Sequence, residues 1–266
     1  MKISRYLSPQ LYKSIFAGEK DVAIQTERKK LTIFFSDIKD FTATTEQLQP
    51  EEITHLLNEY FTEMSAIAAT HGGTVDKFIG DAILIFFGDP ETKGVTEDAL
   101  ACLRMAHEMQ SRTAELNAKW RLEGIEHRFQ VRMGINTGFC NVGNFGSSDR
   151  MDYTIIGAEA NLAARLQSIA EPGQIVLSYE SYALVSEVFA GHSLPPIQMK
   201  GISRPVVPYV IDGMRASGGQ VSNLISEHAP GLDLYLDPSL MDEAQESRTK
   251  ALLEKAIATL EARPKP

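Results

Sequence analysis

The sequence predicts an α+β fold: a ferredoxin-like βαββαβ palm, in which helices cover one face of an antiparallel sheet. Three observations support this prediction. An apolar, strand-like run at 31–35 precedes a long amphipathic segment at 50–71. Two further strand-like runs are separated by only Gly80 and Asp81, as in a hairpin. A second long amphipathic segment and another strand pair complete the order strand, helix, hairpin, helix, strand.

Each element follows from a local pattern. Residues 1–20 resemble a short helix, and the apolar, β-favouring run at 31–35 is expected to be a buried strand. After a polar stretch at 42–49, Pro50 opens a helix with apolar residues at helical spacing, which Gly72 ends. The later elements are expected to be a hairpin of 74–79 and 82–87, a helix at 95–122, a strand pair of 127–136 and 139–145 around Thr137-Gly138, a helix at 157–169 and a short strand at 173–177.

Three regions are expected along the chain. Residues 1–30 form a helical connector, and residues 31–212 form the main domain. Residues 213–266 form an extension that starts Gly/Ser-rich, is irregular over 221–240 and ends in a helix at 242–262.

Composition excludes several classes of protein. The chain has 266 residues, with 26 Lys and Arg against 35 Asp and Glu, a net charge of −9. This balance argues against a nucleic-acid partner, which would require a dense basic face. No run approaches the roughly 18 apolar residues of a membrane span. Glu19 and Lys20 argue against a signal peptide. A cytoplasmic location is expected, either for the whole protein or for one domain of a membrane-bound parent.

The cysteine and histidine content also limits which metals the chain could bind. Cys102 and Cys140 occur in unrelated contexts, and the six histidines show no HxxxH spacing. A CxxC zinc site and a disulfide framework are therefore excluded. Any metal would be held by carboxylates, which predicts a hard cation such as Mg²⁺ or Mn²⁺.

Two aspartates mark the ends of predicted strands. Asp37 follows the run at 31–35, and Asp81 lies in the turn of the predicted hairpin. In the predicted topology their strands are central and adjacent, so the two carboxylates converge and repel each other unless a cation lies between them. A pair of divalent cations there could clamp a phosphate chain. Alternatively, each aspartate is a turn residue that hydrogen-bonds to local amides.

Three further features are suited to a nucleotide. The backbone from Ile38 to Thr42 leads from a strand toward a helix, and its N–H groups could receive phosphate oxygens. Lys77 stands within an apolar strand, either as a water-facing edge residue or as a donor to a ligand. Asn161 and Arg165 share one face of a predicted helix, where Arg165 could stabilise a phosphoryl group or simply face solvent.

Five motifs occur in order along the chain: Phe35-Ser-Asp-Ile38 with Phe41-Thr42, Asp76-Lys-Phe-Ile-Gly-Asp81, Arg132-Met-Gly-Ile-Asn-Thr-Gly138, Tyr153-Thr-Ile-Ile-Gly157 and Asn161-Leu-Ala-Ala-Arg165. Together they resemble the catalytic domain of the class III nucleotidyl cyclases, specifically bacterial adenylate cyclases of the Lys/Thr subclass. The resemblance extends from about Leu31 to Asp212.

The resemblance implies a metal site and an adenine site. Asp37 and Asp81 match metal-binding aspartates, with the Ile38 carbonyl as a further ligand, and two Mg²⁺ or Mn²⁺ ions are expected per active site. Lys77 and Thr154 match the residues that read adenine. A lysine can donate to adenine N1 and a threonine hydroxyl can accept from the N6 amine, whereas guanine presents the reverse pattern. Guanylate cyclases have an acid at the Lys77 position, so ATP is the predicted substrate.

The remaining matches concern the ribose and the phosphates. Asn161 matches the residue that orients the ribose, and Arg165 matches the one that stabilises the transition state. Phe41 and Thr42 belong to the first motif and are expected to contact substrate. Where relatives often have Lys-Gly-Lys, this chain has Lys200-Gly-Ile-Ser-Arg204, so Lys200 is the expected contact to the triphosphate, with Arg204 as the alternative.

The reaction implied is attack of the ribose 3′-hydroxyl on the α-phosphorus of ATP, which yields 3′,5′-cyclic AMP and pyrophosphate. In this family the metal aspartates of one protomer face the Lys, Thr, Asn and Arg of its partner. A homodimer with two composite sites is therefore expected. Relatives commonly have a sensory or membrane domain upstream, and some in the Lys/Thr subclass respond to bicarbonate, which makes bicarbonate a hypothetical effector.

Three other interpretations fit the sequence less well. A diguanylate cyclase shares the palm, but its GG[DE]EF turn is missing, since Gly72-Gly73 is followed by Thr-Val. A non-catalytic ATP-sensing module predicts the loss of a site residue, yet Asp37, Asp81, Asn161 and Arg165 are all present. A purely structural dimerisation domain gives no reason for a lysine inside a strand.

Overall fold

The computed structural model describes residues 9–18, 24–147, 150–198, 205–215, 225–229, 232–236 and 241–262. The chain forms two compact units. The first comprises the residues up to Glu187 with Gly191–Ile211, and the second comprises Val188–Ala190 with the segment from Asp212 onward. The division into regions 1–30, 31–212 and 213–266 stays a prediction.

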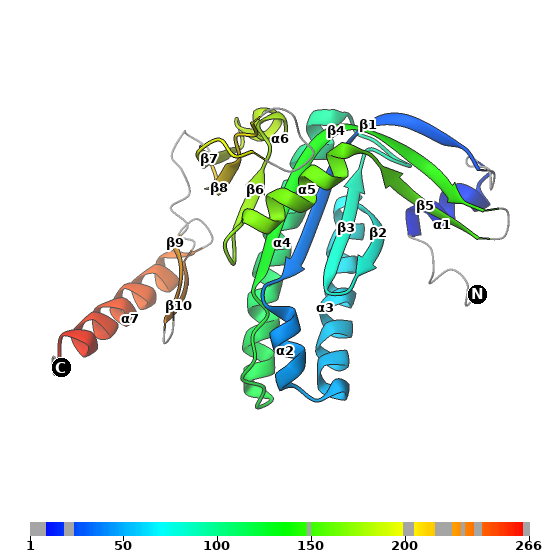
Figure 1. The fold of residues 1–266 in the computed structure, drawn as a ribbon. Helices are drawn as coiled ribbons and strands as arrows, with labels where there is room; N and C mark the ends of the chain where they lie inside the picture. Colours follow the sequence, from blue (N-terminus) through cyan, green and yellow to red (C-terminus); the bar gives the residue numbers. More distant parts are fainter. Residues whose placement is uncertain are drawn as a thin grey trace. The chain divides into compact units, whose positions relative to one another are not determined.

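The main sheet has eight strands, in the order β2-β3-β1-β4-β6-β8-β7, and β5 pairs with β4 (Figure 1). β1 lies antiparallel between β3 and β4, whereas β6 is parallel to β4. The predicted α+β palm is confirmed, including the adjacent strands β1 and β3. The strands are β1 (Thr26–Ile38), β2 (Thr74–Ile79), β3 (Ala82–Phe87), β4 (Val131–Gly146), β5 (Met151–Ile156), β6 (Ile175–Leu177), β7 (Phe189–Ser193) and β8 (Tyr209–Met214). The helices around it are α1 (Pro9–Phe16), α2 (Phe41–Gln47), α3 (Pro50–His71), α4 (Val95–Leu122), α5 (Ala158–Ile169) and α6 (Tyr179–Val185).

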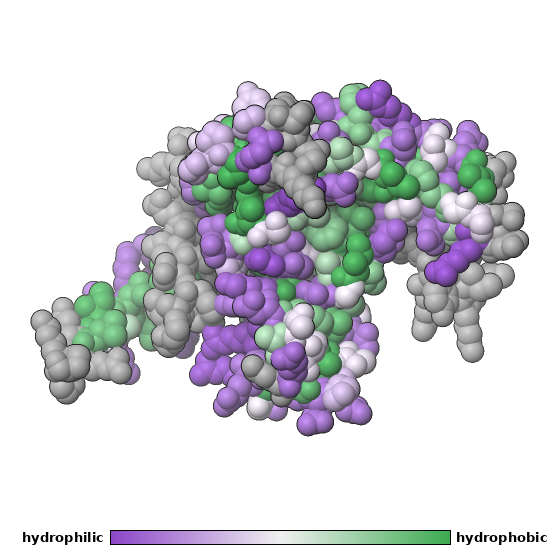
Figure 2. Space-filling view, in the orientation of Figure 1, coloured by the Kyte–Doolittle hydropathy of each residue, from purple (hydrophilic) through white to green (hydrophobic). Residues whose placement is uncertain are grey.

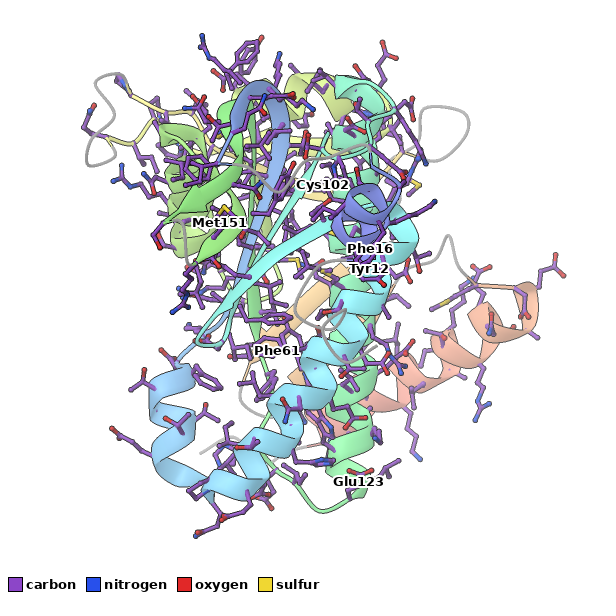
Figure 3. All side chains as sticks on the ribbon, turned by 90° about the vertical axis from the view of Figure 1, so that its right-hand side faces the viewer. Tyr12, Phe16, Phe61, Cys102, Glu123 and Met151 are labelled. Atoms are coloured by element: carbon purple, nitrogen blue, oxygen red, sulfur yellow. The ribbon has the colours of Figure 1, made fainter. Side chains whose placement is uncertain are left out.

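Helices cover both faces of the sheet, so the expectation of helices on one face was wrong. Phe61 on α3, labelled in Figure 3, stacks on Phe78 of β2 with ring centroids 4.2 Å apart. Ala163 on α5 packs instead in a buried cluster that includes Leu84. Phe78 pairs with Ile83, the neighbour of Leu84, and successive strand residues point to opposite faces. Because β3 is buried along its whole length, both faces need a cover.

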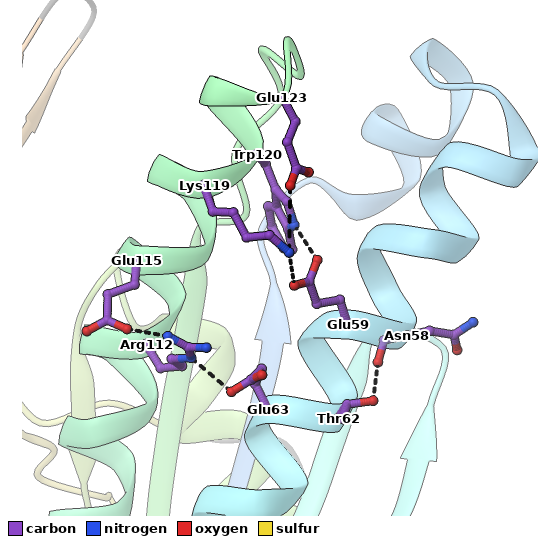
Figure 4. A network of polar contacts seen from close by, with 9 residues as sticks. All are labelled: Asn58, Glu59, Thr62, Glu63, Arg112, Glu115, Lys119, Trp120 and Glu123. Atoms are coloured by element: carbon purple, nitrogen blue, oxygen red, sulfur yellow. Dashed lines mark hydrogen bonds and ion pairs between the residues drawn. The ribbon is translucent and has the colours of Figure 1, made fainter.

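A polar network joins α3 to α4 (Figure 4). Glu59 accepts a hydrogen bond from the indole Nε1 of Trp120 at 2.9 Å and another from Lys119. The Trp120 side chain is fully buried and packs edge-on against Phe129, with ring centroids 5.0 Å apart. Glu59 thus satisfies the one polar atom of the largest core side chain, as buried indoles require.

Strand β4 is one continuous strand, and the predicted strand pair around Thr137-Gly138 was wrong. Thr137 pairs with Thr32 of β1, and their hydroxyls are 3.0 Å apart in the buried interior. Ser181 donates a further hydrogen bond to Thr137 at 2.9 Å. Gly138 leaves room for the side chain of Glu159 on α5, since a Cβ there would lie 2.6 Å from Glu159 Cγ. The glycine therefore serves helix packing rather than a turn.

Other boundaries differ more modestly. The hairpin of β2 and β3 is confirmed, as are helices α3, α4 and α5. The strand expected at 31–35 extends to Thr26–Ile38, because its outer part continues to pair with β4. The polar stretch expected at 42–49 overlaps the short helix α2, at whose ends the backbone N–H of Thr44 donates to the Asp40 carbonyl at 3.0 Å and that of Leu48 to the Thr44 carbonyl at 3.2 Å.

Strand β2 contains a β-bulge. Val75 pairs with Ile85, and Lys77 pairs with Leu84, the next residue along β3. Asp76 is therefore an additional residue that has no ladder partner of its own. Such a bulge places the extra side chain and its successor on the same side of the sheet.

A buried carboxylate fixes β1 and β5 to the end of β3. The side chain of Asp89 has no exposed surface. It accepts a hydrogen bond from Lys29 Nζ at 2.6 Å and another from the hydroxyl of Tyr153. These donors compensate a charge that would otherwise be costly to bury.

In the second unit, β9 (Ile225–Ala229) and β10 (Leu232–Leu236) form an antiparallel hairpin, although an irregular segment was expected over 221–240. Helix α7 (Glu243–Glu261) confirms the predicted terminal helix. Its start is fixed by a capping box between Asp242 and Gln245. Within the part of the chain that the structure describes, no helix combines the length and apolar character needed to cross a membrane.

Candidate active site

The structure brings Asp37 and Asp81 together at one end of β1 and β3. The Asp81 carboxylate accepts a hydrogen bond from the backbone N–H of Ile38 at 2.8 Å. Asp37 lies one residue earlier on β1, directly opposite Arg132 on β4. The guanidinium of Arg132 contacts both oxygens of Asp37, with Nη2 at 2.9 and 3.0 Å.

The acidic pair has an electrostatic cost. Burial raises the pKa of the Asp37 carboxyl, Arg132 opposes this rise, and the neighbouring charge of Asp81 adds to it. Arg132 belongs to a motif that the sequence analysis quoted, but it received no role there. The signal that would have found it is the β1–β4 register, which sequence patterns do not provide.

The donors at this position suit a hard divalent cation. Asp37 and Asp81 offer carboxylate oxygens, and the Ile38 carbonyl is the further ligand that the resemblance implies; carboxylate and carbonyl oxygens are the ligand types that Mg²⁺ and Mn²⁺ prefer. Among the residues that the structure describes, no group of three or more His, Cys, Asp and Glu side chains could hold a metal. A cation bound by two carboxylates fits the usual Mg²⁺ pattern, in which substrate phosphates and water complete the coordination.

Lys77 and Thr154 meet at a third residue. The buried carboxylate of Asp76 accepts a hydrogen bond from the Thr154 hydroxyl at 2.6 Å, and its other oxygen lies 3.4 Å from Lys77 Nζ. Strands β2 and β5 thus bring together a cationic donor and a hydroxyl that are 77 positions apart in sequence. Sequence reasoning quoted Asp76 as part of a motif but assigned it no role.

Asn161 and Arg165 lie on α5, where Asn161 is exposed and Arg165 is half-buried. The helix is fixed tightly on β4. A Cβ at Gly134 would lie 2.2 Å from the backbone N of Gln167 and 2.3 Å from the backbone O of Ala163. Among the described residues, no hydrogen bond or ion pair joins Asn161 or Arg165 to the acidic pair.

The other predicted contacts are less informative. Phe41 begins α2 and packs edge-on against Phe129, with ring centroids 6.4 Å apart. Thr42 follows it and is exposed. Lys200 and Arg204 lie outside the described residues. The roles of these four residues stay predictions.

The domain is suited to bind nucleotides and divalent cations. Its mixed sheet has an acidic pair, Asp37 and Asp81, beside Arg132. It also has a lysine and a threonine, Lys77 and Thr154, near one edge. The family model described as "Adenylate and Guanylate cyclase catalytic domain" matches residues 24–213. The chain therefore belongs to the adenylate and guanylate cyclase catalytic domain family, the class III nucleotidyl cyclases.

Solved structures agree with this assignment. The adenylyl cyclase CyaB from P. aeruginosa is 50% identical with a TM-score of 0.69, and the match covers 71% of this chain and 96% of that one. The guanylyl cyclase Cya2 is 35% identical with the same TM-score of 0.69, over 74% and 99% of the two chains. The family thus includes relatives with either base preference.

Curated relatives are much longer proteins. Adenylate cyclase 1 of Rhizobium meliloti is 35% identical over 142 residues, which is 53% of this chain and 21% of the relative. The terminal-differentiation-specific adenylate cyclase of Dictyostelium discoideum is 32% identical over 215 residues, 78% of this chain and 10% of the relative. The chain therefore spans about a fifth or less of these two proteins.

Proposed function

We propose that this chain is an adenylate cyclase, which converts ATP to 3′,5′-cyclic AMP and pyrophosphate by attack of the ribose 3′-hydroxyl on the α-phosphorus. The observation that supports it most directly is the meeting of Lys77 and Thr154 at Asp76. A lysine donor beside a hydroxyl acceptor complements N1 and the N6 amine of adenine, and opposes the donor and acceptor of guanine. The relatives CyaB and Cya2 are named as adenylyl and guanylyl cyclases, so the base must be inferred from these side chains.

Asp37, Asp81 and the carbonyl of Ile38 would hold two Mg²⁺ or Mn²⁺ ions. When bound, such ions increase the acidity of a hydroxyl and neutralise phosphate oxygens. Arg132 keeps the Asp37 carboxylate oriented across the β1–β4 ladder. Asn161 would hydrogen-bond the ribose, and Lys200 would contact the triphosphate.

Arg165 would neutralise the charge that grows on the α-phosphoryl group. Removing one such donor typically lowers turnover by roughly 10²–10³-fold. The half-buried position of Arg165 on α5 leaves part of the side chain accessible to a ligand.

The active form would be a homodimer with composite sites. Asn161 and Arg165 have no hydrogen bond or ion pair to the acidic pair within the described part of the chain, which is the arrangement expected if they serve the partner's metal site. Phe139 and Ile156 are 55% and 51% exposed, and apolar surface is visible between α5 and β5 in Figure 2. Such surface is usual for an interface between subunits.

The test is cyclic AMP formation from ATP with Mg²⁺ or Mn²⁺, measured at several protein concentrations. Activity should rise more than linearly with protein, disappear with a chelator and disappear in Asp37→Ala. An equal mixture of Asp37→Ala and Arg165→Ala should regain about a quarter of wild-type activity, because half the dimers are mixed and each has one intact site. A folded dimer that forms no product with either ion contradicts the proposal.

Regulation by bicarbonate and by an upstream sensory or membrane domain remains part of the proposal. Bicarbonate titrated at constant pH should raise the rate of cyclic AMP formation. An unchanged rate across the titration removes the effector.

A further inference from the structure

Asp76 is an additional residue in strand β2 with no ladder partner of its own. Val75 and Lys77 pair with Ile85 and Leu84, which are consecutive residues of β3, so the ladder would be regular without Asp76. A bulge places both Asp76 and Lys77 on the side of Leu84, and Leu84 belongs to the core cluster under α5. The bulge therefore directs two side chains toward the face that α5 covers.

The carboxylate placed there is buried among donors. The side chain of Asp76 is 1% exposed. Its Oδ2 accepts from the Thr154 hydroxyl at 2.6 Å and from the Ile155 N–H at 3.3 Å, and its Oδ1 faces Lys77 Nζ at 3.4 Å. Burial raises the pKa of Asp76, while Thr154, Lys77 and Ile155 oppose the rise by stabilising the charged form. Oδ2 thus has two hydrogen-bond donors, whereas buried Oδ1 has no hydrogen bond and faces only the Lys77 ammonium, so the ionised Asp76 carboxylate acts as an acceptor only.

This contact settles which way the Thr154 hydroxyl points. A hydroxyl has a single proton, and Thr154 commits that proton to Asp76. Toward any ligand, Oγ1 then presents lone pairs only, which accept from the N6 amine of adenine and repel the O6 carbonyl of guanine or hypoxanthine. Lys77 is held beside the same carboxylate and is a donor only, which suits the unprotonated N1 of adenine.

We propose that Asp76 is the residue that sets base selectivity, by committing the proton of Thr154 and restraining the ammonium of Lys77. This inference rests on the proposed function, because it specifies how the same site recognises its substrate. Asp76 acts through its two neighbours, so it is a positioning residue and not a catalytic one.

The experiment compares ATP with ITP, whose base differs from adenine at the 6-substituent and at N1. In Asp76→Asn an NH2 group replaces one carboxylate oxygen: where it faces Thr154 it donates to Oγ1 and frees the threonine proton to point at the ligand, and where it faces Lys77 it releases the ammonium. The ratio of kcat/KM for ATP to that for ITP should fall by roughly 10- to 100-fold. Asp98→Asn is the matched control, because buried Asp98 also accepts from a threonine hydroxyl, that of Thr92, and from a backbone N–H, that of Lys93. It should lower stability and leave the ratio unchanged.

A Thr154→Val background shows whether Asp76→Asn changes the ratio through the orientation of the Thr154 hydroxyl or through a general disturbance of the site. There, Asp76→Asn should lose most of its effect on the ratio, since no hydroxyl remains to be oriented. A folded Asp76→Asn that keeps the wild-type ratio overturns the proposal, as does an effect of equal size in both backgrounds. If Asp76→Asn does not fold, Asp76→Glu replaces it, because the extra methylene cannot preserve the 2.6 Å contact.

The wild-type protein distinguishes this inference from the proposed function. If it forms no cyclic nucleotide, the proposed activity fails, and the inference is then tested by the dissociation constants of ATP and ITP measured by calorimetry. Tighter binding of ATP that is lost in Asp76→Asn supports the inference. Equal binding of the two nucleotides by the wild type overturns it.

Discussion

Replacing Gly134 by alanine should separate the position of α5 from the chemistry of its side chains. The new Cβ would lie 2.2 Å from the backbone N of Gln167, whereas ordinary contacts begin at 3.4 Å. Because the obstacle is helix backbone and not a movable side chain, α5 would have to retreat by about 1 Å. A misplacement of this size can cost about 10²-fold in rate, and overpacking typically costs about 1–3 kcal/mol.

Gly138→Ala is the control on the same strand, because its Cβ would meet the side chain of Glu159 instead of helix backbone. We expect Gly134→Ala to lower kcat for cyclic AMP formation by about 10²-fold with a smaller change in KM, and Gly138→Ala to have a much weaker effect. Steady-state kinetics and thermal unfolding followed by circular dichroism provide the measurements. A Gly134→Ala protein with wild-type kcat and Tm would refute the argument that this glycine positions α5.

Two further predictions concern stability. Lys119 and Trp120 lower the pKa of Glu59 below its ordinary value of 4.5, so its charge favours the folded state above that pH. Glu59→Gln should therefore cost about 0.5–1 kcal/mol at pH 7. Urea titrations should find the difference shrinking as the pH falls through the folded-state pKa, and a pH-independent difference would contradict this. Lys29→Met leaves buried Asp89 with one donor fewer and should cost about 1–3 kcal/mol, while Lys30→Met on the exposed neighbour should cost little.

Much of the fold could be predicted from local patterns. Helices α3 and α4 follow from apolar spacing with Pro50 at one start, and the β2–β3 hairpin follows from the two-residue turn at Gly80 and Asp81. Gly138 misled the prediction because glycine in a sequence signals a turn, whereas here it leaves room for the side chain of Glu159 on α5. Packing between segments that are far apart in sequence produces no local sequence pattern.

In the candidate site, too, some residues could be predicted from the local sequence and others could not. Asp37 and Asp81 could be found because each stands at the end of a strand-like run, where a polar residue is conspicuous. Arg132 and Asp76 could not, because their significance lies in partners that are distant in sequence. Arg132 needs the β1–β4 register, and Asp76 needs both a bulge and the approach of β5.

The close packing of α5 on β4 has a consequence for how the proposed cyclase dimer would be controlled. Backbone contact at Gly134 holds one part of the helix, and Asn136 holds its start by donating to the carbonyl of Glu159 at 3.1 Å. The acidic pair is tied to the same strand through the β1–β4 ladder. In the proposed homodimer, the acidic pair and helix α5 of one protomer would therefore move together, although they would serve different active sites. In such a dimer we expect an activating signal to act by rotating the two protomers against each other, as in other subunit-based switches.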